Sequence, residues 1–166
     1  MEFEPDILNP MSKLILKENH GDGIFTTEPI SIGEKIIQFQ GPLLDMSSVP
    51  NENITTPNDD RYIQIGPSTL MGPSGNLDDY INHSCDPNSG VKKYDNEWWL
   101  VAMRNIDKGE EVVWDYSTTM FNDDWEMVCN CRSSNCRKII KEYAFLPESI
   151  KERYETLGIV PDYNLK

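Results

Sequence analysis

The spacing of the four cysteines constrains the fold of this chain more than any other feature of the sequence. Three of them lie within the eight-residue segment 129–136 (CNCRSSNC), and the fourth, Cys85, lies 44 positions upstream of Cys129. A chain of 166 residues can bury about two-thirds of its unfolded surface, so it does not need disulfides to compensate for a missing core. The clustered cysteines therefore need another explanation.

A structural zinc site is the interpretation that this spacing favours. Zn²⁺ prefers four tetrahedral ligands, and four thiolates leave no position for water, so such a site would be closed rather than catalytic. The expected ligands are Cys85, Cys129, Cys131 and Cys136. The ion would pin the C-terminal part of the chain to the segment around Cys85.

Three other interpretations of the cysteines stay open. Buried free cysteines are common singly, but three so close together with polar residues between them are not expected. A thioredoxin-like redox role is disfavoured because one residue, rather than two, separates Cys129 from Cys131. Four cysteines also permit three disulfide pairings, as in a disulfide-framed extracellular binding domain.

The rest of the sequence favours an intracellular protein. No apolar run approaches the roughly 18 residues of a membrane span, and Met1–Pro10 contains three acidic residues and no basic one, unlike a secretory signal. We therefore expect a soluble monomer in the cytoplasm or nucleus that does not bind membranes. A reducing compartment favours metal over disulfides.

The charge balance limits the class of partner. Fifteen basic and 28 acidic residues give a net charge of −13, which argues against direct nucleic-acid binding, because phosphates need a basic surface. A basic protein segment suits this surface better. The charge would equally serve solubility alone, since net charge says more about association than about fold.

Short apolar runs separated by turn residues predict a mostly-β domain. The expected strands are Lys13–Lys17, Gly23–Thr27, Lys35–Phe39, Tyr62–Ile65, Val91–Tyr94 and Trp98–Ala102. A hairpin turn at residues 95–97 would join the last two strands.

Three further segments complete the expected organisation. Residues 30–36 and 106–112 resemble each other, and each is expected to form a tight turn with glycine that leads into a strand. The sequence has no third copy of this segment, so it does not predict a repeat protein. Residues 45–60 are rich in Asn, Pro, Ser and Asp, which is typical of a surface insertion loop. Pro147–Leu157 is expected to form a helix, with Pro147 in its first turn and Gly158 just past its end.

Three motifs in order resemble the SET-domain family of protein lysine methyltransferases. The segment 82–88 (NHSCDPN) matches the family pattern Asn-His-Ser-Cys-x-Pro-Asn, and 111–116 (EVVWDY) matches Glu-Leu-x-Phe-Asp-Tyr. The cysteine segment 129–136 then matches the family's post-SET pattern Cys-x-Cys-x4-Cys. Near the start, 21–23 (GDG) resembles its Gly-x-Gly turn, so the resemblance covers about residues 14–139.

The resemblance implies a β+α fold of small sheets, in which the segment ending at Tyr116 threads beneath the loop that holds Asn82–Cys85. Such threading departs from the usual unknotted connection of elements. On this basis residues 12–117 would form the SET domain, with 45–60 as its insertion, residues 125–140 the post-SET zinc segment, and residues 141–166 a helical C-terminal tail.

The resemblance also assigns roles to a cofactor, S-adenosylmethionine, and to individual residues. Glycines let a backbone approach a ligand closely, and the Gly-x-Gly turn would hold the amino-acid end of the cofactor. Outside their motifs, His83 would be interpreted as a structural histidine and Tyr116 as a core residue. The expected cofactor contacts are Gly21, Asp22, Gly23, Tyr62, Asn82, His83 and Tyr116. Tyr116 and Tyr62 would be the catalytic residues beside the methyl group.

Two positions in the substrate channel depart from the family pattern. Phe39 stands in the place of a tyrosine that usually hydrogen-bonds near the amine, and Trp114 stands where the family has Phe or Tyr. The first change widens the channel and the second crowds it, so the sequence leaves mono-, di- and trimethylation open. The chain also has no cysteine before Cys85, so it lacks the pre-SET cluster of many histone-directed members.

The predicted function is methyl transfer to the side-chain amine of lysine in a protein substrate, a histone or another basic tail. The alternative is a catalytically silent zinc module that binds a protein partner. The family includes bacterial and viral members that act in a host, so the sequence leaves the source and the target open.

Overall fold

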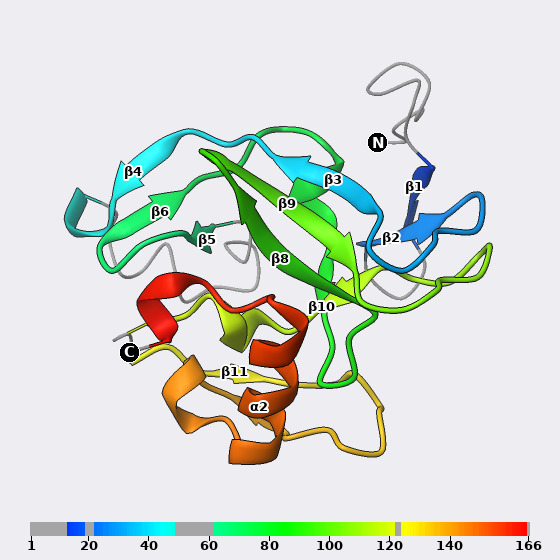
Figure 1. Ribbon diagram of the computed structural model, residues 1–166. Coiled ribbons are helices and arrows are strands. Elements are labelled where there is room, and N and C mark those ends of the chain that lie inside the picture. The colour runs from blue at the N-terminus through cyan, green and yellow to red at the C-terminus, as the bar shows by residue number, and fades with distance from the viewer. Residues whose placement is uncertain (1–12, 19–21, 49–61, 122–123, 166) are drawn as a thin grey trace.

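The computed structural model describes residues 13–18, 22–48, 62–121 and 124–165, and these form a β-rich body with one α-helix near the C-terminus (Figure 1). The strands are β1 (Leu14–Glu18), β2 (Asp22–Thr26), β3 (Lys35–Phe39), β4 (Leu43–Asp45), β5 (Ile63–Gln64), β6 (Thr69–Met71), β7 (Asn82–His83), β8 (Ser89–Tyr94), β9 (Glu97–Ala102), β10 (Val113–Trp114), β11 (Met127–Val128) and β12 (Ile139–Ile140). The helix is α2 (Glu148–Leu157), and the 3₁₀ turns are η1 (Met46–Ser48), η3 (Leu77–Tyr80), η4 (Tyr116–Thr118), η5 (Tyr143–Phe145) and η6 (Asp162–Asn164).

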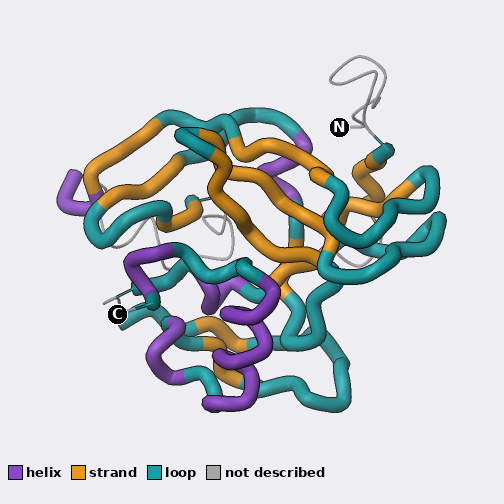
Figure 2. Tube along the Cα trace, viewed as in Figure 1, coloured by secondary structure: helices purple, strands orange, loops and turns teal. Residues whose placement is uncertain are grey.

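Within the described residues the strands form several small sheets rather than one large sheet (Figure 2). The three-stranded antiparallel sheets have the orders β3-β9-β8 and β4-β6-β5, and the pairs are β1-β2, β11-β12 and β7-β10. The mostly-β prediction is confirmed. All six expected strands form, with ends that differ by no more than a few residues.

The predicted hairpin between β8 and β9 is tighter than the sequence indicated. Tyr94 pairs with Glu97, so two residues make the turn and Glu97 already belongs to β9. Asp95 adopts a positive φ of 54°, as such two-residue turns require and as aspartate tolerates.

The two similar turn segments lie against each other. Ile30 and Ile106 form an isolated antiparallel bridge, in which each amide donates to the other carbonyl at 2.9 and 2.8 Å. Gly33 and Gly109 hold positive φ angles of 83° and 88°, which glycine adopts without steric penalty. The repeated local sequence is therefore two equivalent turns that pack together.

The segment that leads to Tyr116 lies between two parts of the preceding loop. On one side β10 pairs in parallel with β7. On the other side the Asn88 side chain donates to the Glu111 carbonyl at 2.7 Å and accepts from the Val113 amide at 3.0 Å, and Ser89 Oγ donates to the Val113 carbonyl at 2.7 Å. This arrangement agrees with the predicted threading.

The C-terminal tail packs beneath β8 in the view of Figure 1 and has its own apolar cluster. This cluster consists of Met103, Tyr143, Leu146, Tyr154, Ile159 and Val160. Helix α2 begins one residue later than expected, because Pro147 is its extended N-cap rather than a residue of its first turn. Gly158 ends the helix as predicted, in the left-handed conformation.

The sequence missed the shortest elements. Strands such as β7, β10, β11 and β12 have two residues each, which is too short for an alternating pattern to be visible. The predicted loop 45–60 begins differently from the expectation, since Asp45 ends β4 and a 3₁₀ turn follows, while residues 49–61 lie outside the described part. No helix in the described ranges is long and apolar enough to span a membrane.

Candidate functional site

The four cysteines meet at one point although Cys85 is far from the others in sequence. Their sulfur atoms all lie within 4.8 Å of one another, and the Sγ atoms of Cys85 and Cys129 are 3.8 Å apart. A tetrahedral zinc ion with Zn–S bonds of about 2.3 Å places neighbouring sulfurs about 3.8 Å apart. The cluster therefore has the donor set of a four-thiolate zinc site, and the Cys85–Cys129 distance is that of two thiolates on one zinc ion.

Backbone amides surround these sulfurs. The amide of Cys131 donates to Cys129 Sγ and that of Arg137 donates to Cys85 Sγ, both at 3.4 Å. Such contacts favour the thiolate form that a metal requires. Positive φ angles at Arg132 and Lys138 turn the chain on either side of Cys136, so that the segment folds back toward Cys85.

The surroundings of Cys85, Cys129 and Cys131 shift the pKa values of these thiols in different directions. Burial raises the pKa of Cys85 to about 11 and also raises the pKa of Cys129. At Cys131 burial opposes ionisation, but hydrogen bonds, chiefly from Ser133, outweigh it and lower the pKa to about 6. A cation at the centre would be needed to hold all of the thiols as thiolates.

A narrow cavity of about 20 Å³ lies between the sheets, which is room for about one water molecule. Residues from β3, β5, β6, η3, β10 and η4 line it: Phe39, Tyr62, Ile63, Met71, Gly72, Asp78, Asp79, Ile81, Trp114 and Tyr116. The structure thus brings together both predicted catalytic tyrosines and both predicted channel residues.

Trp114 is in contact with two other aromatic residues of the cavity, Phe39 and Tyr116. The rings of Phe39 and Trp114 meet edge-on with centroids 6.1 Å apart, and the rings of Trp114 and Tyr116 are 4.8 Å apart. Phe39 and Trp114 are each 6% exposed. Trp114 therefore belongs to the core as well as to the cavity wall, which restricts how far the wall can move.

The Tyr116 hydroxyl has a defined orientation. It donates its proton to the Ile81 carbonyl at 2.6 Å. Because that proton is committed to Ile81, the hydroxyl can act toward a group in the cavity only as an acceptor.

The expected cofactor residues Asp22, Gly23 and Asn82 also converge. The Asn82 side-chain amide donates to the Asp22 carbonyl at 2.6 Å and to Glu111 Oε1 at 2.9 Å. A Cβ on Gly23 would lie 2.5 Å from Glu111 Oε1 and 3.2 Å from the Asn82 amide nitrogen, so this place tolerates only glycine without a shift. Gly21 lies outside the described residues.

The His83 side chain faces the interior. Its side chain is 3% exposed, and burial lowers the pKa of His83 to about 4, so the ring is neutral near pH 7. Nδ1 accepts the Tyr116 amide at 3.0 Å, which leaves the proton on Nε2, 3.4 Å from Cys85 Sγ. Any ligand contact from His83 would have to come from its backbone, and its ring links Tyr116 to the cysteine cluster.

One acidic residue of the cavity, Asp78, is mostly buried. Asp78 is 9% exposed and accepts hydrogen bonds from Ser74 Oγ and the Gln40 amide. Burial raises the pKa of Asp78, although these hydrogen bonds oppose the effect. The carboxyl therefore takes up a proton more readily than an exposed aspartate.

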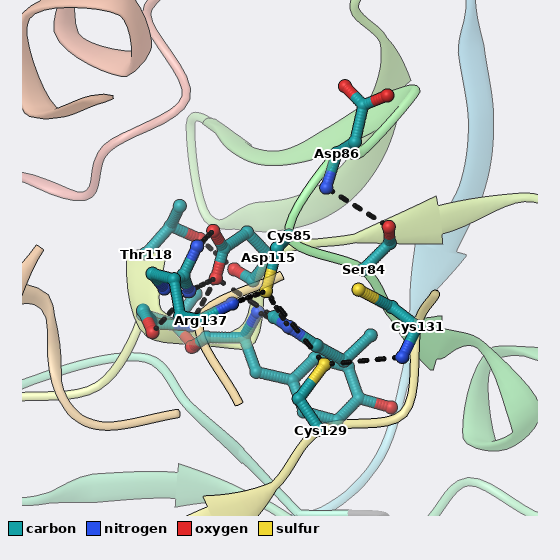
Figure 3. A network of polar contacts seen from close by, with 12 residues as sticks. Ser84, Cys85, Asp86, Asp115, Thr118, Cys129, Cys131 and Arg137 are labelled. Carbon is teal, nitrogen blue, oxygen red and sulfur yellow. Dashed lines mark hydrogen bonds and ion pairs between the residues drawn. The ribbon is translucent and has the colours of Figure 1, made fainter. Parts of the chain in front are cut away.

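The sequence did not identify the ion pair beside the cysteines (Figure 3). Arg137 forms two hydrogen bonds to the Asp115 carboxylate, at 2.9 and 2.8 Å, and Tyr154 Oη donates to it at 2.8 Å. Local signals did exist for two of these residues, since Arg137 follows Cys136 directly and Asp115 precedes Tyr116. No local signal pointed to Tyr154.

Comparisons with known proteins agree with this geometry. Residues 21–117 match the family described as SET domain. The chain is 28% identical over 153 residues to the probable histone-lysine N-methyltransferase set-23 of Caenorhabditis briggsae, covering 83% of this chain and 61% of that protein. It is 33% identical over 137 residues to the putative histone-lysine N-methyltransferase ASHH4 of Arabidopsis thaliana, covering 76% of this chain and 38% of that protein.

The fold is similar to crystal structures of KRYPTONITE. The structure in complex with mCHG DNA and SAH gives a TM-score of 0.60 at 22% identity, covering 78% of this chain and 30% of that chain. The structure with mCHH DNA, an H3(1-15) peptide and SAH gives a TM-score of 0.59 at 22% identity, covering 77% of this chain and 29% of that chain.

The fold and the site define a small β-rich domain with a four-cysteine cluster and a narrow cavity lined in part by Tyr62 and Tyr116. The chain belongs to the SET-domain family, as the match over residues 21–117 shows. It spans less than two-thirds of the length of the curated relatives named above.

Proposed function

We propose that this protein transfers a methyl group from S-adenosylmethionine to the side-chain amine of lysine in a protein substrate. The observation that carries the proposal is the position of Tyr116. Its hydroxyl lies in the wall of a narrow cavity and its proton is bound by the Ile81 carbonyl. With its proton donated in this way the hydroxyl acts toward the cavity as an acceptor, the role that weak C–H···O contacts from a methyl group and the orientation of an amine require.

The cofactor would lie where Gly23, Asn82 and the His83 backbone meet. Bound there, S-adenosylmethionine supplies a methyl group on a positively charged sulfur. The close approach of Asn82 and Glu111 to Gly23 supports this placement, since only a residue without a side chain lets these two polar groups lie against the turn. The Asn82 side chain is well placed to receive the amino-acid end of the cofactor.

The task of the protein is alignment and deprotonation. An in-line displacement needs the two reactants held in a fixed geometry, and the walls formed by Phe39, Trp114 and Tyr116 restrict an incoming lysine to one direction. A free lysine has a pKa near 10.4, so about one amine in a few thousand is neutral at pH 7. Desolvation between these aromatic walls lowers that pKa and favours the neutral nucleophile.

A zinc ion would be held by Cys85, Cys129, Cys131 and Cys136. The support is the single cluster of sulfurs, which lie within 4.8 Å of one another. The ion would fix residues 125–140 against the Cys85 segment, next to His83 and Tyr116. It has a structural role in this proposal and takes no part in methyl transfer.

The proposed substrate is a histone tail, and the proposed site of action is the nucleus. The names of the relatives from Caenorhabditis briggsae and Arabidopsis thaliana support a histone, and the net charge of −13 suits a basic segment. The proposal includes a monomeric protein that does not bind DNA directly, and the division into residues 12–117, 125–140 and 141–166 stays a prediction.

The test is transfer of labelled methyl from S-adenosylmethionine to core histones and to mixed cell proteins under zinc-replete conditions. Wild type should label lysine, and Tyr116→Phe should lose most of the turnover while it keeps cofactor affinity and zinc. Normal turnover of Tyr116→Phe would refute the role of the hydroxyl. If wild type shows no methyl transfer and no cofactor binding, the result favours the alternative, a silent zinc module that binds a protein partner.

A further inference from the structure

The carboxylate of Asp115 is buried, and its acceptor positions are occupied by hydrogen-bond donors. Its side chain is 0% exposed. It accepts two hydrogen bonds from Arg137, one from Tyr154 Oη and one from the Ser117 amide at 3.1 Å. A carboxylate offers about four acceptor positions, and each Asp115 oxygen has two donors, so the loss of any donor leaves one acceptor position of a buried charged oxygen unfilled.

The orientation of this carboxylate determines the turn that carries Tyr116. Asp115 is the N-cap of η4 and accepts the Ser117 amide with its side chain, while its carbonyl accepts both the amide and the hydroxyl of Thr118. The Tyr116 amide at the start of this turn donates to His83 Nδ1. A shift of Asp115 would therefore move the backbone of Tyr116 relative to the cavity.

Tyr154 reaches Asp115 from a part of the chain outside the family match, which ends at residue 117. Tyr154 is 0% exposed. Burial, reinforced by the negative charge of Asp115, raises its pKa, so the hydroxyl stays a donor. The chain just after its helix packs closely against β8, because a Cβ on Gly90 would lie within 2.6 to 2.8 Å of Ile159 side-chain atoms.

A second tyrosine of the tail, Tyr163, contacts the backbone of two segments that lead to the cavity. Tyr163 Oη lies 2.9 Å from the Gln64 carbonyl in β5 and 2.7 Å from the Thr119 carbonyl just after η4. The tail thus contacts the backbone near Tyr62 and the backbone near Tyr116.

We infer that the C-terminal tail supports the methyl-transfer site through Tyr154. Tyr154 is a positioning residue that holds Asp115 and, through it, Tyr116. This inference rests on the proposed function, because it assigns Tyr116 to the reaction. Tyr154 itself touches neither the cavity nor a reactant.

The experiment compares Tyr154→Phe with Tyr143→Phe in the full chain with zinc. Tyr143 is a matched control, since it is 4% exposed, lies in the same tail and donates to a carboxylate, Glu155 Oε1, at 2.7 Å, without contact to Asp115. Tyr154→Phe should lower kcat about tenfold, as the loss of one hydrogen bond to a buried charge implies. KM for S-adenosylmethionine and zinc content should not change, and Tyr143→Phe should keep kcat within about twofold of wild type.

A second measurement does not depend on turnover. Hydrogen exchange of the Tyr116 amide, followed by NMR, should become faster in Tyr154→Phe relative to amides of the central strand β9, and should not do so in Tyr143→Phe. Equal kcat in the two variants, or equal acceleration at Tyr116 and in β9, would overturn the inference. If wild type transfers no methyl to any substrate, the proposed function fails, and the exchange data alone decide whether Tyr154 positions Tyr116.

Discussion

Replacing Arg137 by methionine should destabilise the protein far more than a surface ion pair would. Arg137 supplies two of the donors to Asp115, whose side chain is 0% exposed, so methionine would leave a buried carboxylate without its counter-charge. Breaking a buried pair from one side costs about 3–5 kcal/mol. In a chain of this size, 1 kcal/mol corresponds to about 2–4 °C, so the melting temperature should fall by about 6–20 °C.

The chain contains a matched control for this substitution. Arg104 also binds a carboxylate through two nitrogens, with distances of 3.0 and 3.3 Å to Glu110, but the two side chains are 51% and 32% exposed. Arg104→Met should therefore cost less than about 1 kcal/mol. The geometry of the two pairs is similar, so the difference between the variants isolates the effect of burial.

The assay is urea and thermal unfolding of both variants, followed by tryptophan fluorescence, with zinc content measured in each sample. Adding Asp115→Asn to Arg137→Met should restore part of the lost stability, because the uncompensated charge is then absent. Similar losses for Arg137→Met and Arg104→Met, each below about 1 kcal/mol, would refute the argument that the Asp115 carboxylate is buried and saturated.

Three other substitutions test the remaining parts of the site. Cys129→Ser should reduce zinc from one ion per chain to a substoichiometric amount and lower the melting temperature, as metal analysis and calorimetry would detect, whereas a wild type purified without zinc would contradict the site. Gly23→Ala should push Glu111 away from Asn82 and weaken S-adenosylmethionine binding about 2–10-fold in calorimetry with little change in stability, and unchanged affinity would contradict the placement of the cofactor. Asp78→Asn should stabilise the protein at pH 7. The raised folded-state pKa of Asp78 means that its ionised form opposes folding above that pKa, so the gain should fade as pH falls into the range where aspartate is protonated in both states, and a gain independent of pH would contradict this.

Much of the fold was predictable because local patterns and turn chemistry agree with the tertiary structure. Short apolar runs bounded by turn residues located β3 and β9, and the glycine after Leu157 marked the end of α2. The boundaries were less certain where the deciding hydrogen bonds are not local. Proline is common in the first turn of a helix, yet Pro147 is the N-cap residue of α2 and has an extended conformation.

The candidate site was predictable to the extent that its residues sit in contiguous motifs. The motif that contains Asn82 and the motif that ends at Tyr116 indicated which residues would meet, and the structure brings Tyr62, Trp114 and Phe39 to the same cavity as Tyr116. The direction in which a side chain points could not be read in the same way. Motif spacing does not show that the His83 ring is buried against Cys85, with Nε2 3.4 Å from its sulfur, rather than directed toward a ligand.

The sequence by itself determined the cysteine pattern, the order of the motifs and the short apolar runs between turn residues that make this chain β-rich, because these depend on residue type and spacing alone. Only the tertiary structure decided which polar groups share the buried space beside the site. Tyr154 and Asp115 are 39 positions apart, and nothing local distinguishes Tyr154 from a tyrosine on the surface of a helix. The physical reason is that a buried carboxylate must find its donors wherever the fold brings them within reach, and that choice is made by packing rather than by spacing along the chain.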